Sequence, residues 1–240
     1  MKYTFMIILT ALLLLSGCDN DPVSSNEYEY EEQEFNTIDL TAQTELIVEN
    51  TNGSITILDS DTAKTIQVEI RKKVRSKISE RDAKSHISDI NVSPLSGLSS
   101  VRLSVNNPSS DDRDYEINIE IILPKNFNYD LALGNGTINI TSETKNINLS
   151  LGNGTVEADL VLADNCEAGV TVGNGTINFK VPNNTNAMFV ASVGNGSIVN
   201  NGLSFQNQQT TSRTFSGRLG NGNGSIVLSL GNGTITMLGN

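Results

Sequence analysis

The sequence predicts an all-β protein whose larger part is a single-stack β-solenoid, similar to a parallel β-helix, with an N-terminal β segment and one short helix. Three observations carry this prediction. The chain of 240 residues has no Trp, 5% aromatic residues and 20 Gly, a composition typical of many turns around a thin core. Apolar and polar residues alternate over much of the chain. From residue 131 onward one short motif recurs.

The recurring motif reads Gly-Asn-Gly, then Thr or Ser, then Ile or Val, and Leu or Val precedes it in every copy except the one at Gly222. Its first glycines stand at positions 134, 152, 173, 194, 222 and 231, and a looser copy, NTNGSI, occupies 50–55. The steps of 18, 21, 21, 28 and 9 residues suit coils of two or three short strands, because a solenoid repeats one small unit per layer. Residues 131–240 are therefore predicted to form the solenoid.

Each Gly-Asn-Gly is predicted to be the corner that the chain turns in every coil. Gly supplies positive φ or close backbone approach, and Asn amides can bond between layers about 4.8 Å apart. The predicted amide ladder comprises Asn135, Asn153, Asn174, Asn195, Asn223 and Asn232. The predicted structural glycines are Gly134, Gly136, Gly152, Gly154, Gly173, Gly175, Gly194 and Gly196.

The apolar residues on either side of the corner are predicted to form two buried rows. The row before the corner comprises Leu133, Leu151, Val172 and Val193. The row after it comprises Ile138, Val156, Ile177 and Ile198. The final stretch, LGNGTITMLGN, stops within a repeat, so we expect an uncapped solenoid end that invites homo-association.

Residues 36–130 are predicted to form an N-terminal β segment that is continuous with the solenoid. TELIVENTNGSITILDSD and TIQVEIRKKV alternate as β-strands do, and strands resume with VRLSVNN and YEINIEIILPKN. The one helix is predicted at about 79–90, where Ser79 can cap the first turn. Ala83, Ile87 and Ile90 form its apolar stripe.

The first 18 residues, MKYTFMIILTALLLLSGC, have a basic start, an apolar stretch and small residues before a cysteine, which is typical of a secretory signal. The ending LSGC resembles a bacterial lipobox, which implies removal of residues 1–17 and lipidation of Cys18. Several acyl chains anchor stably where one is marginal. We expect a protein of the cell envelope, lipid-anchored to the inner or outer membrane, in which residues 18–35 form the lipidated Cys and an acidic, solvated tether.

The formal charge of −11 argues against a nucleic-acid partner. A basic cluster is interpreted as a solvated strand and helix face, rather than a patch for anionic lipid or acidic polysaccharide. The cluster comprises Arg71, Lys72, Lys73, Arg75, Lys77, Arg81 and Lys84. Cys166 has no partner for an intramolecular disulfide and lies far along the chain from the single His, so we interpret it as a lone thiol in a loop.

The Gly-Asn-Gly motif does not match cofactor chemistry. A Walker loop needs Lys-Ser/Thr after its second Gly, and both Walker and Rossmann loops lead into a helix, whereas strand-like residues follow each copy here. Calcium-binding solenoid repeats carry Asp in each turn, and these turns carry Asn. We therefore predict no cofactor, no metal and no catalytic site. The remote alternative is a polysaccharide-active enzyme that uses Glu157 and Asp159, two residues apart on one strand face.

The order of the motifs resembles the putative-adhesin domain family, a bacterial envelope family of unknown function. The resemblance rests on LIVENTNGSITI (46–57), YEINIEIILPKN with LALGNGTINI (115–140) and FSGRLGNGNGSIVLSLGNGTITM (215–237), and it covers residues 35–240. It implies a β-helical, solenoid-like fold and brings no catalytic residues. The strict Gly-Asn-Gly departs from the Ser-Gly-Asp or Asn-Gly-Asp of relatives, which makes metal binding still less expected.

The sequence therefore favours a non-catalytic, adhesin-like binding or display module that contacts glycan, cell wall or another protein. The alternative is a structural or regulatory envelope protein, which acts by self-association or by partnering a membrane protein of the envelope-stress response. The two functions differ in where the contact lies: on the faces of the coils, or at the ends of the stack.

Overall fold

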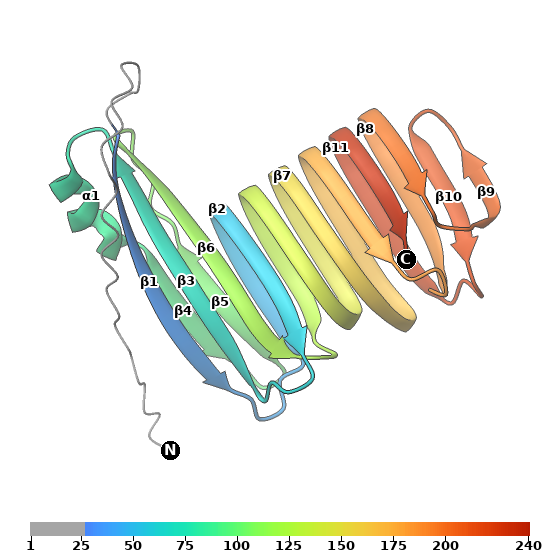
Figure 1. Cartoon of the computed structure of the whole chain (residues 1–240), viewed down its shortest axis with the longest axis horizontal. Helices are drawn as coiled ribbons and strands as arrows, with labels where there is room; N and C mark the ends of the chain where they lie inside the picture. The colour runs from blue at the N-terminus through green and yellow to red at the C-terminus, as the bar shows by residue number, and fades with distance from the viewer. Residues whose placement is uncertain (1–26) are drawn as a thin grey trace.

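The computed structural model describes residues 27–240, which form one open β-sheet and a single short helix (Figure 1). The predicted all-β class is confirmed. The sheet mixes parallel and antiparallel pairs in the order β1-β3-β6-β2-β7-β11-β8-β10-β9, with β5 beside β2 and β4 beside β5. The strands are β1 (Tyr28–Asp39), β2 (Glu45–Ser60), β3 (Thr65–Ser76), β4 (Asn91–Ser96), β5 (Ser100–Asn106), β6 (Arg113–Pro124), β7 (Asn128–Val181), β8 (Ala187–Asn201), β9 (Gln206–Thr210), β10 (Thr214–Leu219) and β11 (Gly224–Gly239).

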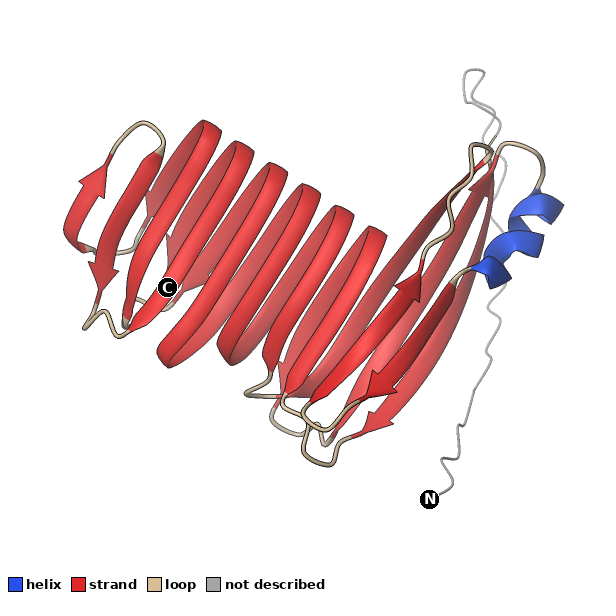
Figure 2. Ribbon diagram, turned by 180° about the vertical axis from the view of Figure 1, so that it is seen from behind, coloured by secondary structure: helices blue, strands red, loops and turns tan. Residues whose placement is uncertain are grey.

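The centre of the sheet is parallel and brings the Gly-Asn-Gly copies into register. β2 pairs with β7 so that Asn52 lies opposite Asn135. β7 is 54 residues long and passes three corners, and the ribbon bends back repeatedly along one side of the sheet (Figure 2). Successive passes lie side by side, since Asn153 bonds to Asn135 and Asn174 bonds to Asn153. Equivalent residues of the repeat therefore occupy equivalent places in neighbouring layers.

The last strand along the chain is an inner strand of the sheet. β11 pairs in parallel with β7 on one side, where Ile235 lies opposite Ile177, and with β8 on the other, where Ile235 lies opposite Ile198. The connection from β7 to β8 skips one layer, and the chain fills that layer only after completing β9 and β10. The predicted uncapped end at LGNGTITMLGN is therefore wrong, because this repeat is enclosed on both sides.

The N-terminal end of the sheet is antiparallel and charged. Residues 28–35, predicted as solvated tether, belong to β1 and pair with β3, so the tether prediction is wrong for them. The reason is charge complementarity with the basic cluster, which is non-local. Lys73 Nζ lies 3.4 Å and Arg75 Nε 3.1 Å from the Glu29 carboxylate, and the buried Lys72 pairs with Glu34.

The one helix, α1 (Glu80–His86), continues into a 3₁₀ turn at Ile87–Asp89, within the predicted range. Ser79 Oγ caps it by accepting from the N–H of Asp82 at 3.1 Å. The Asp82 carboxylate accepts two hydrogen bonds from Arg113, at 2.6 and 2.8 Å, and one from Ser76 at 2.7 Å. These bonds hold the pKa of Asp82 at about 2 and fasten the helix to β6 and β3.

The two predicted rows line the core. Every member of the row before the corner is at most 3% exposed. In the row after it, Ile138, Val156 and Ile177 are completely buried, whereas Ile198 on β8 is only partly covered. Past β8 the core is closed by an aromatic cluster of Phe189, Phe205 and Phe215, whose ring centroids lie 4.7 to 6.3 Å apart.

Candidate ligand-binding groove

The corner amides form a continuous row of hydrogen bonds in stack order rather than chain order. Each Nδ2 donates to the Oδ1 of the preceding layer at 2.6 to 2.8 Å. In stack order the row comprises Asn52, Asn135, Asn153, Asn174, Asn232 and Asn195. Hydrogen bonds between these side-chain amides thus link six layers along one side of the sheet.

One predicted member of the ladder lies elsewhere, and one member was missed. Asn223 belongs to the turn before β11, where Gly222 has φ of 74° and its N–H donates to Leu219 O. The Gly-Asn-Gly copy at 222–224 therefore lies at the start of β11 and not at a corner within a strand. The next corner, at Gly231, follows only nine residues later. Asn52, in the looser NTNGSI copy, takes the first place in the row instead.

The corner glycines permit close contact between layers. The second glycines, Gly136, Gly154, Gly175 and Gly196, have φ of 133 to 140°, and a Cβ on Gly154 would lie 1.8 Å from Gly136 O. At the first glycines, Gly134, Gly152, Gly173 and Gly194, a Cβ would lie 2.4 to 2.6 Å from a carbonyl oxygen of the adjacent layer. The glycines therefore stand where no side chain fits.

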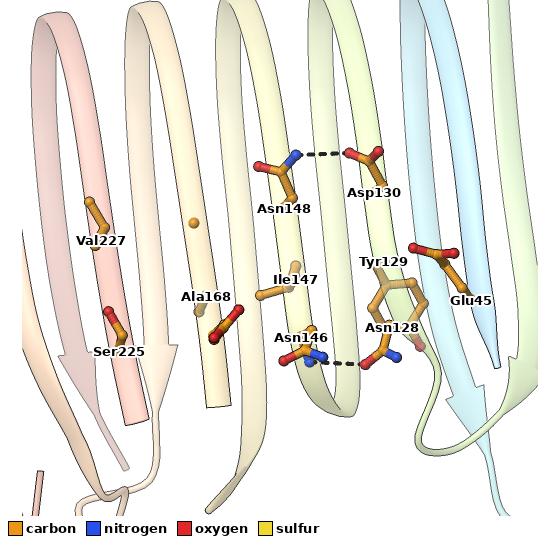
Figure 3. Close-up of a pocket in the computed structure, with 12 residues that line it drawn as sticks. Glu45, Asn128, Tyr129, Asp130, Asn146, Ile147, Asn148, Ala168, Ser225 and Val227 are labelled. Atoms are coloured by element: carbon orange, nitrogen blue, oxygen red, sulfur yellow. Dashed lines mark hydrogen bonds between the residues drawn. The ribbon is translucent and has the colours of Figure 1, made fainter. Parts of the chain in front are cut away.

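A groove of about 550 Å³ crosses the strand stretches that precede the corners (Figure 3). It spans β2, β7 and β11, so it depends on the stacking of layers that are far apart in the sequence. Its polar lining comprises Glu45, Asn128, Asp130, Asn146, Asn148, Glu167 and Ser225. No cofactor or metal is implied by this set, and residues 27–240 contain no cluster of three metal-ligating side chains.

Pairs of polar groups from neighbouring layers order the groove floor. Asn148 Nδ2 donates to Asp130 Oδ1 at 2.9 Å, and Asn128 Oδ1 accepts from the Asn146 backbone N–H at 3.1 Å (Figure 3). These bonds hold the side chains in place before any ligand arrives. They leave Asp130 Oδ2, Asn148 Oδ1 and Asn128 Nδ2 without a part in these two bonds.

Gly169 hollows the floor beside this ordered pair. A Cβ there would meet nothing closer than Asn148 Oδ1 at 3.7 Å, so a methyl group would fit there with only ordinary van der Waals contacts. Val227 lies opposite Gly169 on β11 and is 45% exposed. The groove thus combines polar walls with one small apolar contact surface.

The groove has acidic side chains and no basic one. Glu45, Asp130 and Glu167 line it without a Lys or Arg. Carboxylates accept hydrogen bonds, while the Asn amides both donate and accept. Hydroxyl and ammonium groups complement this lining, whereas a ligand rich in carboxylate, sulfate or phosphate would be repelled.

Sequence reasoning missed the groove, although a signal was present. Asn128 and Asp130 recur as Asn146 and Asn148, 18 residues later, which is the same step that separates the first two corners. A polar residue that repeats with the corner period must lie in the same column on the outer face.

The predicted carboxylate pair lies outside the groove. Glu157 and Asp159 follow the corner, and each is engaged by the next layer: Asn178 Nδ2 donates to Glu157 at 2.7 Å, and Lys180 Nζ lies 2.7 Å from Asp159. The two carboxylates thus serve as links between layers. Neither carboxylate lines the groove.

Of the two cysteines, only Cys166 lies among the residues that the structure describes. Cys166 lies buried within β7 against Gly224, rather than in a loop as predicted. Burial raises the pKa of its thiol, which leaves it protonated and unreactive. Cys18 and the predicted signal lie outside the described residues. Within residues 27–240 no helix is long and apolar enough to cross a membrane.

Comparison with known proteins yields similarity of fold. No family model and no curated protein sequence matches the chain. A crystal structure of a putative cell adhesion protein from Clostridium sporogenes aligns with a TM-score of 0.53 at 16% identity, covering 88% of this chain and 100% of that one. Putative adhesins from Bacteroides fragilis and Parabacteroides merdae align at TM-scores of 0.29 and 0.31, with 9% and 11% identity, over 86% and 85% of this chain and 97% and 95% of theirs. The Clostridium structure shares the fold of the chain.

Proposed function

We propose that the protein is a non-catalytic, adhesin-like module of the bacterial envelope that binds a glycan in the groove. The observation that carries this proposal is the groove itself: a floor of amides and carboxylates ordered by Asn148 and Asp130. In this proposal the parallel centre is a β-solenoid, whose stacked corners keep the floor rigid. The name of the Clostridium sporogenes structure, a putative cell adhesion protein, agrees with it.

The proposed ligand is a neutral or amino-bearing oligosaccharide. Sugar hydroxyls exchange hydrogen bonds with Asn128 and Asn146, an ammonium group pairs with Asp130 or Glu167, and a CH-rich sugar face rests on Val227. Acidic polysaccharides are excluded by the three carboxylates of the lining.

Binding to immobilised neutral, amino and acidic glycans tests this proposal. Replacing both Asn148 and Asp130 by Ala should abolish binding to neutral or amino glycans. The matched control replaces Asn178 and Glu157, an amide–carboxylate pair of the same kind at 2.7 Å on the stretch after the corner. Preferential binding of acidic glycans, or equal loss in both double variants, contradicts the groove as the site.

The envelope location is proposed on the strength of the LSGC sequence at Cys18. Lipidation there attaches the chain to the membrane about ten residues before β1 begins. Replacing Cys18 by Ala should release the protein from the membrane fraction and remove the label when cells are grown with a radioactive fatty acid. A Cys18→Ala protein that remains in the membrane fraction with its label contradicts the anchor.

A further inference from the structure

The outermost layers at the C-terminal end of the sheet leave half of β8 without a partner strand. β10 pairs with residues 187–192 of β8, whereas β11 pairs with β8 along nearly its whole length on the other side. In the part of the chain that the structure describes, no strand pairs with the outer side of residues 195–201. We call this stretch, with the sequence NGSIVNN, the open edge.

Side-chain burial at the open edge reflects the missing layer. Ile198 is partly exposed, although its equivalents in inner layers, Ile177 and Ile235, are completely buried. Val199 is 44% exposed. Asn195 is the last member of the amide row, and its Nδ2 donates inward to Asn232. Another strand on the outer side would cover the apolar pair and pair the backbone.

The charge distribution distinguishes this end of the molecule. All 27 acidic residues precede position 181, and residues 181–240 carry only two charged side chains, those of Arg213 and Arg218. Exposed sheet edges are usually protected by charged side chains or Pro. The opposite outer strand, β1, has Glu29, Glu31 and other acids, whereas the open edge has neither charge nor Pro.

We propose that the open edge is a self-association surface, at which residues 195–201 of two copies pair antiparallel about a twofold axis. The same segment supplies both strands, so backbone donors and acceptors match, and Ile198 and Val199 of each copy gain cover from the other. No acidic side chain of residues 181–240 opposes the approach. Pairing with the β1 edge of another copy is disfavoured, because that edge carries glutamates and α1 packs beside it.

Sedimentation equilibrium of the purified protein over a range of concentrations tests this inference. The wild-type chain should fit a monomer–dimer equilibrium. Val199→Lys places two like charges close together in the dimer and should weaken association by roughly tenfold or more. Val199→Thr, which adds no charge, should leave the dissociation constant within about twofold of wild type.

Val161→Lys is the matched control, because Val161 is 51% exposed on β7, away from the open edge. It should leave the dissociation constant unchanged, and circular dichroism should report the same fold for all variants. A wild-type protein that stays monomeric at every concentration overturns the proposal. So does growth into species larger than a dimer, or equal weakening by Val161→Lys and Val199→Lys. The proposal does not depend on the groove, and glycan binding is measured separately.

Discussion

The two ends of the sheet are built from different chemistry. At the N-terminal end, β1, β3 and β6 are antiparallel and rich in charge, and the ion pairs extend to α1 through Asp82 and Arg113. At the C-terminal end, β8, β9 and β10 carry one charged side chain, that of Arg218, and the core beneath them is closed by the aromatic cluster. Between them lies the parallel centre, in which neither charge nor aromatic packing dominates and the corners set the spacing.

The two ends of the sheet differ in how well they are protected against pairing with a strand of another chain. The charged end protects its outer strand from pairing with another chain, since an inserted strand would have to bury glutamates. The uncharged end closes its core with rings but leaves a backbone edge available. The two ends should therefore respond differently to acid, to truncation and to protein concentration.

The largest effect is expected from removing β11. Deleting residues 224–240 removes the parallel pairing with both β7 and β8 and leaves a gap one strand wide in the core. We expect no cooperative thermal transition by circular dichroism. A chain that lacks only Asn240 loses one bond, from Asn183 N–H to Asn240 O at 3.1 Å, and should melt close to wild type. Cooperative melting of the larger truncation would show that β11 is peripheral.

A large effect is also expected from Gly154→Ala at an inner corner. The new Cβ would lie 1.8 Å from Gly136 O, at φ of 134°, so the free energy of unfolding should fall by on the order of 3 kcal/mol. Urea unfolding measures it. Gly169→Ala in the same strand meets nothing closer than 3.7 Å and should change stability by less than about 0.5 kcal/mol. Equal losses would contradict the close-contact role of the corner glycines.

Acid should loosen the charged end selectively. Hydrogen bonds from Arg113 and Ser76 lower the pKa of Asp82 to about 2 from an ordinary value of about 3.9. Because the folded-state pKa is depressed, the stability it contributes is present above pH about 4 and is lost as the pH falls toward 2. Hydrogen exchange, corrected for intrinsic rates, should therefore increase in α1 and β6 but not in β8. In Asp82→Asn, acid should no longer increase exchange in α1 and β6 more than in β8. An equal increase in all three elements of the wild-type protein would argue against the contrast between the ends.

The smallest effect is expected in the amide row. Asn153→Ala removes two exposed links, to Asn135 and from Asn174, and should lower the free energy of unfolding by about 1 kcal/mol. Asn223→Ala, outside the row, should have no measurable effect. If the two substitutions were equivalent in urea unfolding, the row would be a consequence of stacking and not a contributor to it.

The features that could be predicted from the sequence are those set by local chemistry. The alternation of apolar residues predicted which side chains are buried, and Gly-Asn-Gly predicted where β7 bends. The strand order could not be predicted in this way, because every copy of the motif presents a similar edge to its neighbour and β11 fits between β7 and β8 as well as beyond them. The pairing of β1 with β3 was missed because Glu29 and Arg75 are 46 residues apart and each alone is typical of a solvated face.

The groove was missed for a related reason. Polar residues on an outer strand face are ordinary. Asp130, Asn148 and Val227 form one surface only because neighbouring layers bring them side by side. That juxtaposition follows from the strand order, including the place of β11. The candidate site is therefore no more predictable than the topology that builds it.

The strand order at β11 is the claim on which both the groove and the contrast between the ends depend. Ser229 lies opposite Thr171 of β7 on one side and Ser192 of β8 on the other. Cysteine pairs at 171/229, 229/192 and 171/192 can be treated with a thiol cross-linker that spans adjacent layers, about 5 Å apart, and analysed by mass spectrometry. We expect links in the first two pairs and none in the third. Efficient linking of 171 to 192, with none to 229, would place β7 beside β8 and contradict the account.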